Sequence, residues 1–167
     1  MKTCLVGCGG IAAVHGSVLT SDIDTEFVAA ADIKPKKAQT YAENFHTKPY
    51  PSLESMLEAE KPDVLHICTP HYLHVPMAIY SLERNINVFM EKPPAISFDQ
   101  LEELKKAAAK SEAQLGFCYQ NRYNASIRAA KGSDRLRQSR KKSSAARAFV
   151  TWCRGAAIIP KVAGEAA

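Results

Sequence analysis

The sequence has no uninterrupted apolar run that approaches the roughly 18 residues needed to cross a bilayer. Its first residues lead directly into a short strand-like segment, without the apolar stretch of a secretory signal peptide. The five cysteines are odd in number and lack the paired spacing that is typical of zinc sites. These absences predict a cytoplasmic protein with reduced thiols, no membrane partner and no metal site.

The chain also has too few residues for two large cores, since 167 residues are enough for one. Apolar residues make up 46% and charged residues 23%, as in an ordinary globular protein. The net charge of +5 comes from one segment: residues 128–147 hold eight Lys or Arg and one Asp. Residues 1–127 hold 12 basic and 15 acidic residues, so the basic segment needs an explanation of its own.

The stretch Lys2–Gly16 (KTCLVGCGGIAAVHG) has the features of a dinucleotide-binding turn. A short apolar run precedes Gly7, Gly9 and Ala12, which follow the G-x-G-x-x-G/A spacing. Gly7 permits a tight exit from a strand, and Gly9 lets backbone N–H groups approach a pyrophosphate. Ala12 is small enough for the next helix to pack against the strand. A helix that begins near Gly10 would direct its positive end at the phosphates.

A second strand-like run, residues 25–31, ends at Asp32. An acid about twenty residues after the glycines is where the ribose 2′-hydroxyl needs a hydrogen-bond acceptor. A structural turn would explain an isolated glycine cluster, but strand, turn, helix and distant acid together favour a cofactor site. We therefore expect the cofactor to contact Gly7, Gly9, Gly10, Ile11, Ala12 and Asp32.

Strand-like and helix-like segments alternate along the rest of the chain. The periodicity predicts helices over residues 36–45, 53–60, 73–84 and 98–111, with Ser52 and Ser97 as N-caps, and strands over 64–68, 87–90 and 114–119. This alternation predicts an α/β fold with a doubly wound parallel sheet and right-handed crossovers. Ligands bind such sheets beyond the carboxyl ends of the strands.

Two polar segments follow strands at that expected edge, the run 69–74 (TPHYLH) and Glu91-Lys92-Pro93. A lysine there can orient a nicotinamide and donate to a substrate oxygen that gains charge during hydride transfer. A surface lysine that closes a turn explains the same spacing equally well. His71 and His74 are candidate general bases, although a histidine at the start of a helix more often caps or packs.

Five segments in this order resemble the Gfo/Idh/MocA family over residues 1–131: GCGGIA, Asp32, DVLHICTPHYLH, NVFMEKP and GFCYQNRYNASIRAAK. The resemblance implies a Rossmann domain of an NAD(P)-dependent oxidoreductase that acts on sugars, polyols or related hydroxy compounds. It implies that the lysine of EKP, Lys92, belongs to the active site, and that the Thr-Pro turn lies along the cofactor. On this basis the cofactor site would also include Thr69, Pro70, His71, His74, Glu91 and Lys92.

The charge of Asp32 favours NAD, because it would repel the 2′-phosphate of NADP. Three lysines follow closely in sequence and would soften this preference: Lys34, Lys36 and Lys37. NAD is therefore the expected cofactor, with NADP left open.

In the family that this sequence resembles, a second domain forms the substrate pocket, and Arg122-Tyr123-Asn124 marks the passage into it. Only 44 residues follow Tyr123. We expect a Rossmann domain over residues 1–121, a truncated start of an α+β substrate domain over 122–167, and disorder over 132–145. Such a chain would bind the nucleotide while lacking most of the catalytic domain. The longer parent enzyme would form a homo-oligomer.

The basic run Arg135–Lys142 (RLRQSRKK) allows two interpretations. Taken as written, it is a phosphate-binding tail for nucleic acid, but it lacks the interleaved aromatic residues that stack on bases. Alternatively, residues 134–139 and 157–166 can yield family-like peptides in shifted reading frames, which indicates frameshifts in the gene or its recorded sequence. We favour the frameshifts and expect no nucleic-acid partner. A non-catalytic dinucleotide-binding module is the alternative to an enzyme.

Overall fold

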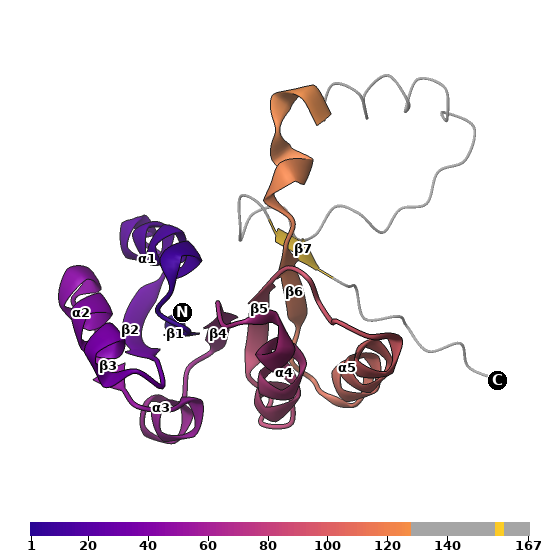
Figure 1. Ribbon diagram of the computed structural model, residues 1–167, viewed down its shortest axis with the longest axis horizontal. Helices are drawn as coiled ribbons and strands as arrows, with labels where there is room; N and C mark the ends of the chain where they lie inside the picture. Colours follow the sequence, from indigo (N-terminus) through magenta and orange to yellow (C-terminus); the bar gives the residue numbers. More distant parts are fainter. Residues whose placement is uncertain (128–155, 159–167) are drawn as a thin grey trace.

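The computed structural model describes residues 1–127 and 156–158, which form a seven-stranded sheet with helices on both faces (Figure 1). The first elements are β1 (Lys2–Val6), α1 (Gly10–Ser21), β2 (Glu26–Ala31), α2 (Pro35–Phe45), β3 (Lys48–Tyr50), α3 (Leu53–Glu60) and β4 (Val64–Ile67). They are followed by the short 3-10 helix η1 (His71–Leu73), α4 (His74–Leu82), β5 (Asn87–Glu91), α5 (Phe98–Lys110), β6 (Leu115–Cys118), η2 (Gln120–Tyr123) and β7 (Ala156–Ile158).

The strand order is β3-β2-β1-β4-β5-β6-β7, and neighbouring strands from β3 to β6 are parallel. The chain winds outward from β1 to β3, then returns to β4 and winds outward the other way. Right-handed crossovers then place α1 and α2 on one face and α3, α4 and α5 on the other (Figure 1). This confirms the predicted doubly wound α/β fold.

The sequence did not predict the strand β7, the short strand β3 or the two 3-10 helices. The strand β7 pairs antiparallel with β6, so Ala156 lies opposite Cys118 and Ile158 opposite Gly116. Its three residues have no apolar alternation that could be recognised as a strand on its own. The basic run 135–142, the segment 132–145 and most of the segments assigned to frameshifts lie outside the described residues.

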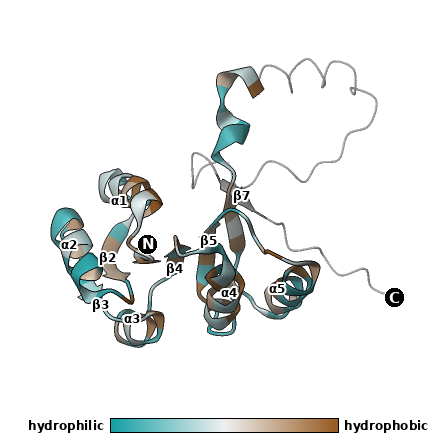
Figure 2. Ribbon diagram, in the orientation of Figure 1, coloured by the Kyte–Doolittle hydropathy of each residue, from teal (hydrophilic) through white to brown (hydrophobic). Residues whose placement is uncertain are grey.

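The core forms two clusters, one on each face of the sheet. Successive strand residues point to opposite faces, so Leu5 enters one cluster and its neighbours Cys4 and Val6 enter the other. The smaller cluster lies under α1 and α2. Figure 2 shows α2 mostly teal and α1 mostly white and brown, and α1 exposes the apolar side chains Val14 and Val18.

Local signals set most helix boundaries. The predicted N-caps are confirmed, because Ser52 Oγ accepts from Ser55 N and Ser97 Oγ accepts from Gln100 N, each at 3.2 Å. The helix expected over 73–84 is shorter: α4 ends at Leu82, after which the chain turns through a left-handed Asn85 with φ of 56°.

Candidate functional site

The predicted site residues follow β1, β2, β4 and β5, so their turns lie at the same edge of the parallel sheet. The turn after β1 touches the turn after β4. Gly7 has φ of +93°, and a Cβ on it would lie 2.7 Å from the Cys68 carbonyl carbon and the Thr69 nitrogen. A larger residue would therefore be strained and would overlap with backbone. Gly7 is required by the fold itself.

Gly9 and Gly10 differ from Gly7, because a Cβ on either would meet nothing within 4 Å. Gly9 is the N-cap of α1, and no side chain caps this helix or places an acid in its first turn. The first N–H groups of α1 therefore have no side-chain acceptor and border open space. An uncapped helix N-terminus beside small residues fits the pyrophosphate of a dinucleotide.

Behind this turn α1 packs closely on α2. Ala12 is fully buried and its carbonyl accepts from Tyr41 Oη at 2.7 Å, whereas Ile11 is 38% exposed. A Cβ on Gly16 would lie 2.5 Å from Tyr41 Oη and 2.7 Å from Phe45 Cζ. The spacing of the glycine turn predicts close packing at Ala12 but gives no sign of it at Gly16. Gly16 packs against Tyr41 and Phe45 of a second helix, α2, which local spacing does not reveal.

Asp32 connects the turn after β2 with the glycine turn. Its Oδ2 accepts from Cys8 N at 2.9 Å, and its Oδ1 accepts from Lys34 N at 2.8 Å. Each carboxylate oxygen keeps capacity for a further donor, as a ribose hydroxyl would require. Burial, together with the Asp32 charge, raises the pKa of the Cys8 thiol to about 12, so this thiol stays protonated near neutrality.

His74 joins the turns after β4 and β5. Its side chain is fully buried, with Nδ1 2.8 Å from the Pro93 carbonyl oxygen and Nε2 3.0 Å from the Thr69 carbonyl oxygen. Both ring nitrogens of His74 therefore lie within hydrogen-bond distance of a backbone carbonyl, one in each turn. His71 and Pro70 are exposed, and the His71 ring lies 5.5 Å from that of His74.

Glu91 is the last residue of β5 and Lys92 follows it, and the two side chains have opposite environments. Glu91 is 4% exposed, and its Oε2 accepts from the Lys92 backbone nitrogen at 3.3 Å. The Lys92 side chain is exposed and forms no hydrogen bond or ion pair within the described part of the chain. Its ammonium group is therefore free to meet a ligand at this edge.

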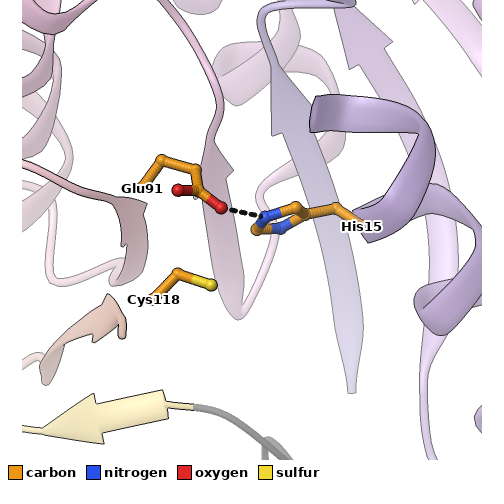
Figure 3. A group of neighbouring side chains, drawn as sticks. All are labelled: His15, Glu91 and Cys118. Atoms are coloured by element: carbon orange, nitrogen blue, oxygen red, sulfur yellow. Dashed lines mark hydrogen bonds and ion pairs between the residues drawn. The ribbon is translucent and has the colours of Figure 1, made fainter. Parts of the chain in front are cut away.

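A buried polar cluster that the sequence analysis did not identify lies beside Lys92. His15 from α1, Glu91 from β5 and Cys118 from β6 point towards one another (Figure 3). His15 Nε2 lies 3.0 Å from Glu91 Oε1, and one nitrogen, oxygen or sulfur atom from each of the three residues lies within 4.8 Å of the others. These atoms are of the types that ligate transition metals, although His15 and Glu91 already satisfy each other.

The cluster continues to His66 in β4, whose Nδ1 lies 3.0 Å from His15 Nδ1. Burial, and the neighbouring His15, lower the pKa of His66 to about 3, so its ring is neutral. Burial opposes ionisation of Glu91, but hydrogen bonds from His15, Cys118 and the Lys92 amide outweigh it and lower the pKa of Glu91. The cluster therefore holds an ionised Glu91 carboxylate and a neutral His66 ring.

One signal in the sequence could have indicated His15. The buried residues of α1 are spaced at i, i+3, i+4 and i+7, and His15 is the polar member of that set: Ala12, His15, Gly16 and Leu19. A histidine on an inward face requires a buried partner. That partner, Glu91, is 76 residues away, so its identity depends on the fold.

Comparison with known proteins identifies the same region. A family model for an oxidoreductase family with an NAD-binding Rossmann fold matches residues 1–119. Over 125 residues the chain is 31% identical to D-glucoside 3-dehydrogenase of Escherichia coli K12, covering 74% of this chain and 36% of that enzyme. Over 120 residues it is 28% identical to glucose-6-phosphate 3-dehydrogenase of Bacillus subtilis 168, covering 71% of this chain and 34% of that enzyme.

A solved structure has a similar fold. The WlbA dehydrogenase of Chromobacterium violaceum, in complex with NADH and UDP-GlcNAcA, superposes with a TM-score of 0.78 at 31% identity. The match covers 84% of this chain and 40% of that enzyme. The chain thus spans about a third of the length of the two 3-dehydrogenases that it resembles.

Proposed function

Because this chain belongs to the Gfo/Idh/MocA oxidoreductase family, whose N-terminal part is an NAD-binding Rossmann domain, we propose how its own residues hold the cofactor. The N–H groups of the glycine turn and of the first turn of α1 bind the pyrophosphate. Asp32 accepts from the adenosine ribose hydroxyls. The open space at Gly9 is the observation that carries this proposal. The proposed cradle consists of Gly7, Gly9, Gly10, Ile11 and Ala12.

The nicotinamide end lies along the turns after β4 and β5. Thr69, Pro70 and His71 border it, and the free ammonium of Lys92 reaches the reacting centre. Bound NAD supplies the hydride acceptor, and Lys92 donates a hydrogen bond to the substrate oxygen whose charge changes in the reaction. Glu91 and buried His74 contribute by holding these two turns together.

NAD is the preferred cofactor in this proposal. A 2′-phosphate would approach the Asp32 carboxylate, which is already held by two backbone amides and has no cationic side chain in hydrogen-bond contact within the described residues. Lys34 shares only its backbone nitrogen with Asp32. The lysines after β2 can therefore soften the preference for NAD without reversing it.

The parent enzyme would dehydrogenate a hydroxyl group of a sugar or polyol. The names of the two 3-dehydrogenases and the sugar nucleotide bound by the WlbA enzyme support this substrate class. Residues 1–121 would be the Rossmann domain and residues 122–167 the start of a substrate domain. The longer parent enzyme would contain the rest of that domain and would form a homo-oligomer. On its own the chain binds the dinucleotide without turnover. We propose no nucleic-acid partner.

We place the protein in the cytoplasm. Among the described residues, Cys4, Cys8 and Cys68 are free thiols, as expected in a reducing compartment. No helix within the described residues has the length and apolar character to cross a membrane.

Calorimetric titration of the purified chain with NAD, NADP and ADP-ribose tests the function. We expect saturable binding of NAD and ADP-ribose, a raised melting temperature with NAD, and weaker binding of NADP. Addition of sugars or polyols with NAD should produce no reduced nicotinamide absorbance. Folded protein that releases no heat with either nicotinamide cofactor would overturn the proposal.

A further inference from the structure

A continuous chain of hydrogen bonds crosses the sheet edge from β4 to the turn after β5. His66 Nδ1 contacts His15 Nδ1 at 3.0 Å, and His15 Nε2 contacts Glu91 Oε1 at 3.0 Å. The other oxygen of Glu91 accepts from the Lys92 amide at 3.3 Å. His15, His66 and Glu91 are each at most 7% exposed, so water does not substitute for any of these contacts.

The partners assign the protons along this chain. Because the Glu91 carboxylate accepts, His15 Nε2 must carry a proton, and His15 Nδ1 is then the acceptor. His66 Nδ1 must therefore donate to it, which leaves His66 Nε2 as a bare lone pair. That nitrogen is buried and has no hydrogen-bond partner among the described residues, which agrees with this assignment. The reverse assignment would bury an unpartnered N–H and a cationic ring.

This series of hydrogen bonds connects two parts of the proposed cofactor site that lie on strands separated by β4 in the sheet. His15 belongs to α1, whose first turn forms the proposed phosphate cradle, while Lys92 follows β5. The strand β4 lies between β1 and β5 and contributes His66, which is paired with Leu5 on one side and Phe89 on the other. A rigid helix thus reaches across β4 to the carboxylate next to Lys92.

We propose that His15 is a positioning residue that acts through Glu91 to hold the Lys92 turn at a set distance from the phosphate cradle. The nicotinamide end of the dinucleotide then meets Lys92 while the pyrophosphate stays on α1. His66 selects the His15 tautomer that donates to Glu91. This inference rests on the proposed function of the same site.

A metal ion would compete with this arrangement. His15, Glu91 and Cys118 are the group within residues 1–127 whose ligand atoms lie close enough to hold one. A metal would displace the proton from His15 Nε2, take the freed lone pair and replace the hydrogen bond to Glu91. The hydrogen bond between His15 and Glu91 and a bound metal would use the same atoms and exclude each other, so the experiments that test one also test the other.

The test compares NAD with ADP-ribose, which lacks the nicotinamide. His15→Gln retains an amide donor for Glu91, and we expect both affinities within about twofold of wild type. His15→Asn is too short to reach Glu91, and we expect NAD to bind about tenfold more weakly while ADP-ribose changes by less than about twofold. If His15→Asn fails to fold, His15→Asn with Glu91→Gln removes the unpaired buried charge and should show the same selective loss of NAD affinity.

Two further measurements bear on the mechanism. In a Lys92→Ala background the effect of His15→Asn on NAD should disappear, because the two residues act in one unit. Long-range ¹H–¹⁵N spectra should show protons on His15 Nε2 and His66 Nδ1.

Four results would overturn the inference. The first is an equal loss of NAD and ADP-ribose affinity in His15→Asn, which indicates a general structural role. The second is no loss of either affinity, and the third is an undiminished effect in Lys92→Ala. The fourth is a cobalt–thiolate absorption band that Cys118→Ser abolishes, which indicates a metal site. Wild-type protein that binds neither NAD nor ADP-ribose would instead refute the proposed function.

Discussion

Two buried glutamates, Glu60 and Glu91, lie at opposite ends of the parallel strands and have different partners. We call the side of the sheet where the parallel strands begin the amino edge, and the side where they end the carboxyl edge. Glu60, at the end of α3, is 5% exposed and is contacted by Lys2 Nζ at 3.0 Å, Lys48 Nζ at 2.9 Å and Tyr50 Oη at 2.6 Å. Glu91, at the end of β5, is 4% exposed and is contacted by His15 Nε2 at 3.0 Å and by the Lys92 backbone amide at 3.3 Å. Two glutamates of similar burial therefore differ in their partners: two ammonium groups contact Glu60, whereas no lysine or arginine side chain contacts Glu91 within the described residues.

This difference distinguishes the amino edge, where the charged groups contact one another, from the carboxyl edge, where we propose that the cofactor binds. At the amino edge, hydrogen bonds from Tyr50 and Lys48 lower the pKa of Glu60 to about 2, and the bond to Glu60 raises the pKa of Tyr50 to about 12. There the Glu60 carboxylate accepts from two ammonium groups and one hydroxyl. At the carboxyl edge, Lys92 and the first amides of α1 keep unused donors, which a dinucleotide can meet.

The largest expected effect comes from disturbing the glycine turn at the carboxyl edge. Gly7→Ala forces a side chain into a positive φ and against the backbone of Cys68, which should lower the free energy of unfolding by about 3–5 kcal/mol. Gly9→Ala is the matched control, because it should cost under about 1 kcal/mol and yet weaken NAD binding by obstructing the pyrophosphate. Urea denaturation and NAD titration measure both. Equal stabilities for the two variants would contradict the distinction.

The next effect tests the amino edge. Glu60→Ala leaves the Tyr50 hydroxyl without its acceptor and removes the carboxylate that Lys2 and Lys48 contact, so it should lower the free energy of unfolding by about 2–3 kcal/mol. The affinity for NAD should stay unchanged, because Glu60 lies at the opposite edge. Glu60→Gln keeps the shape and one acceptor, so it should cost less. A parallel loss of NAD affinity would show that the two edges are not independent.

A smaller effect is expected at Asp32. Asp32→Asn keeps an acceptor for one backbone amide and removes the charge, so NAD should bind about tenfold more weakly and NADP more tightly than to wild type. Isothermal titration with each cofactor gives the ratio. An unchanged ratio would indicate that Asp32 holds the turn and does not select the cofactor.

The last effect is a pH dependence of stability that is spread over several pH units and divides between the two edges. The folded pKa values of His66 and Glu60 are about 3 and about 2, below their ordinary values of 6.5 and 4.5. The unfolded chain therefore binds more protons in acid, and stability present at neutral pH is lost as pH falls, first from about 6.5 and further from about 4.5.

His66→Asn, which cannot titrate but retains a donor for His15, should flatten the unfolding free energy between pH 6.5 and pH 4.5. Glu60→Gln should flatten it below pH 4.5 and leave the upper range unchanged. Thermal melts in matched buffers measure both slopes. A His66→Asn curve that coincides with wild type would show that His66 is not the group that titrates.

The sequence by itself determined the glycine turn, the acid after the second strand, the helix caps at Ser52 and Ser97, and the winding of the sheet. Each depends on spacing along a few residues or on the period of apolar side chains. Only the tertiary structure decided which buried polar groups meet. It pairs His15 with Glu91, places His74 between the carbonyls of Thr69 and Pro93, and brings two lysines to Glu60. Buried polar groups must find partners, and the strand order and crossovers bring those partners together from distant parts of the chain.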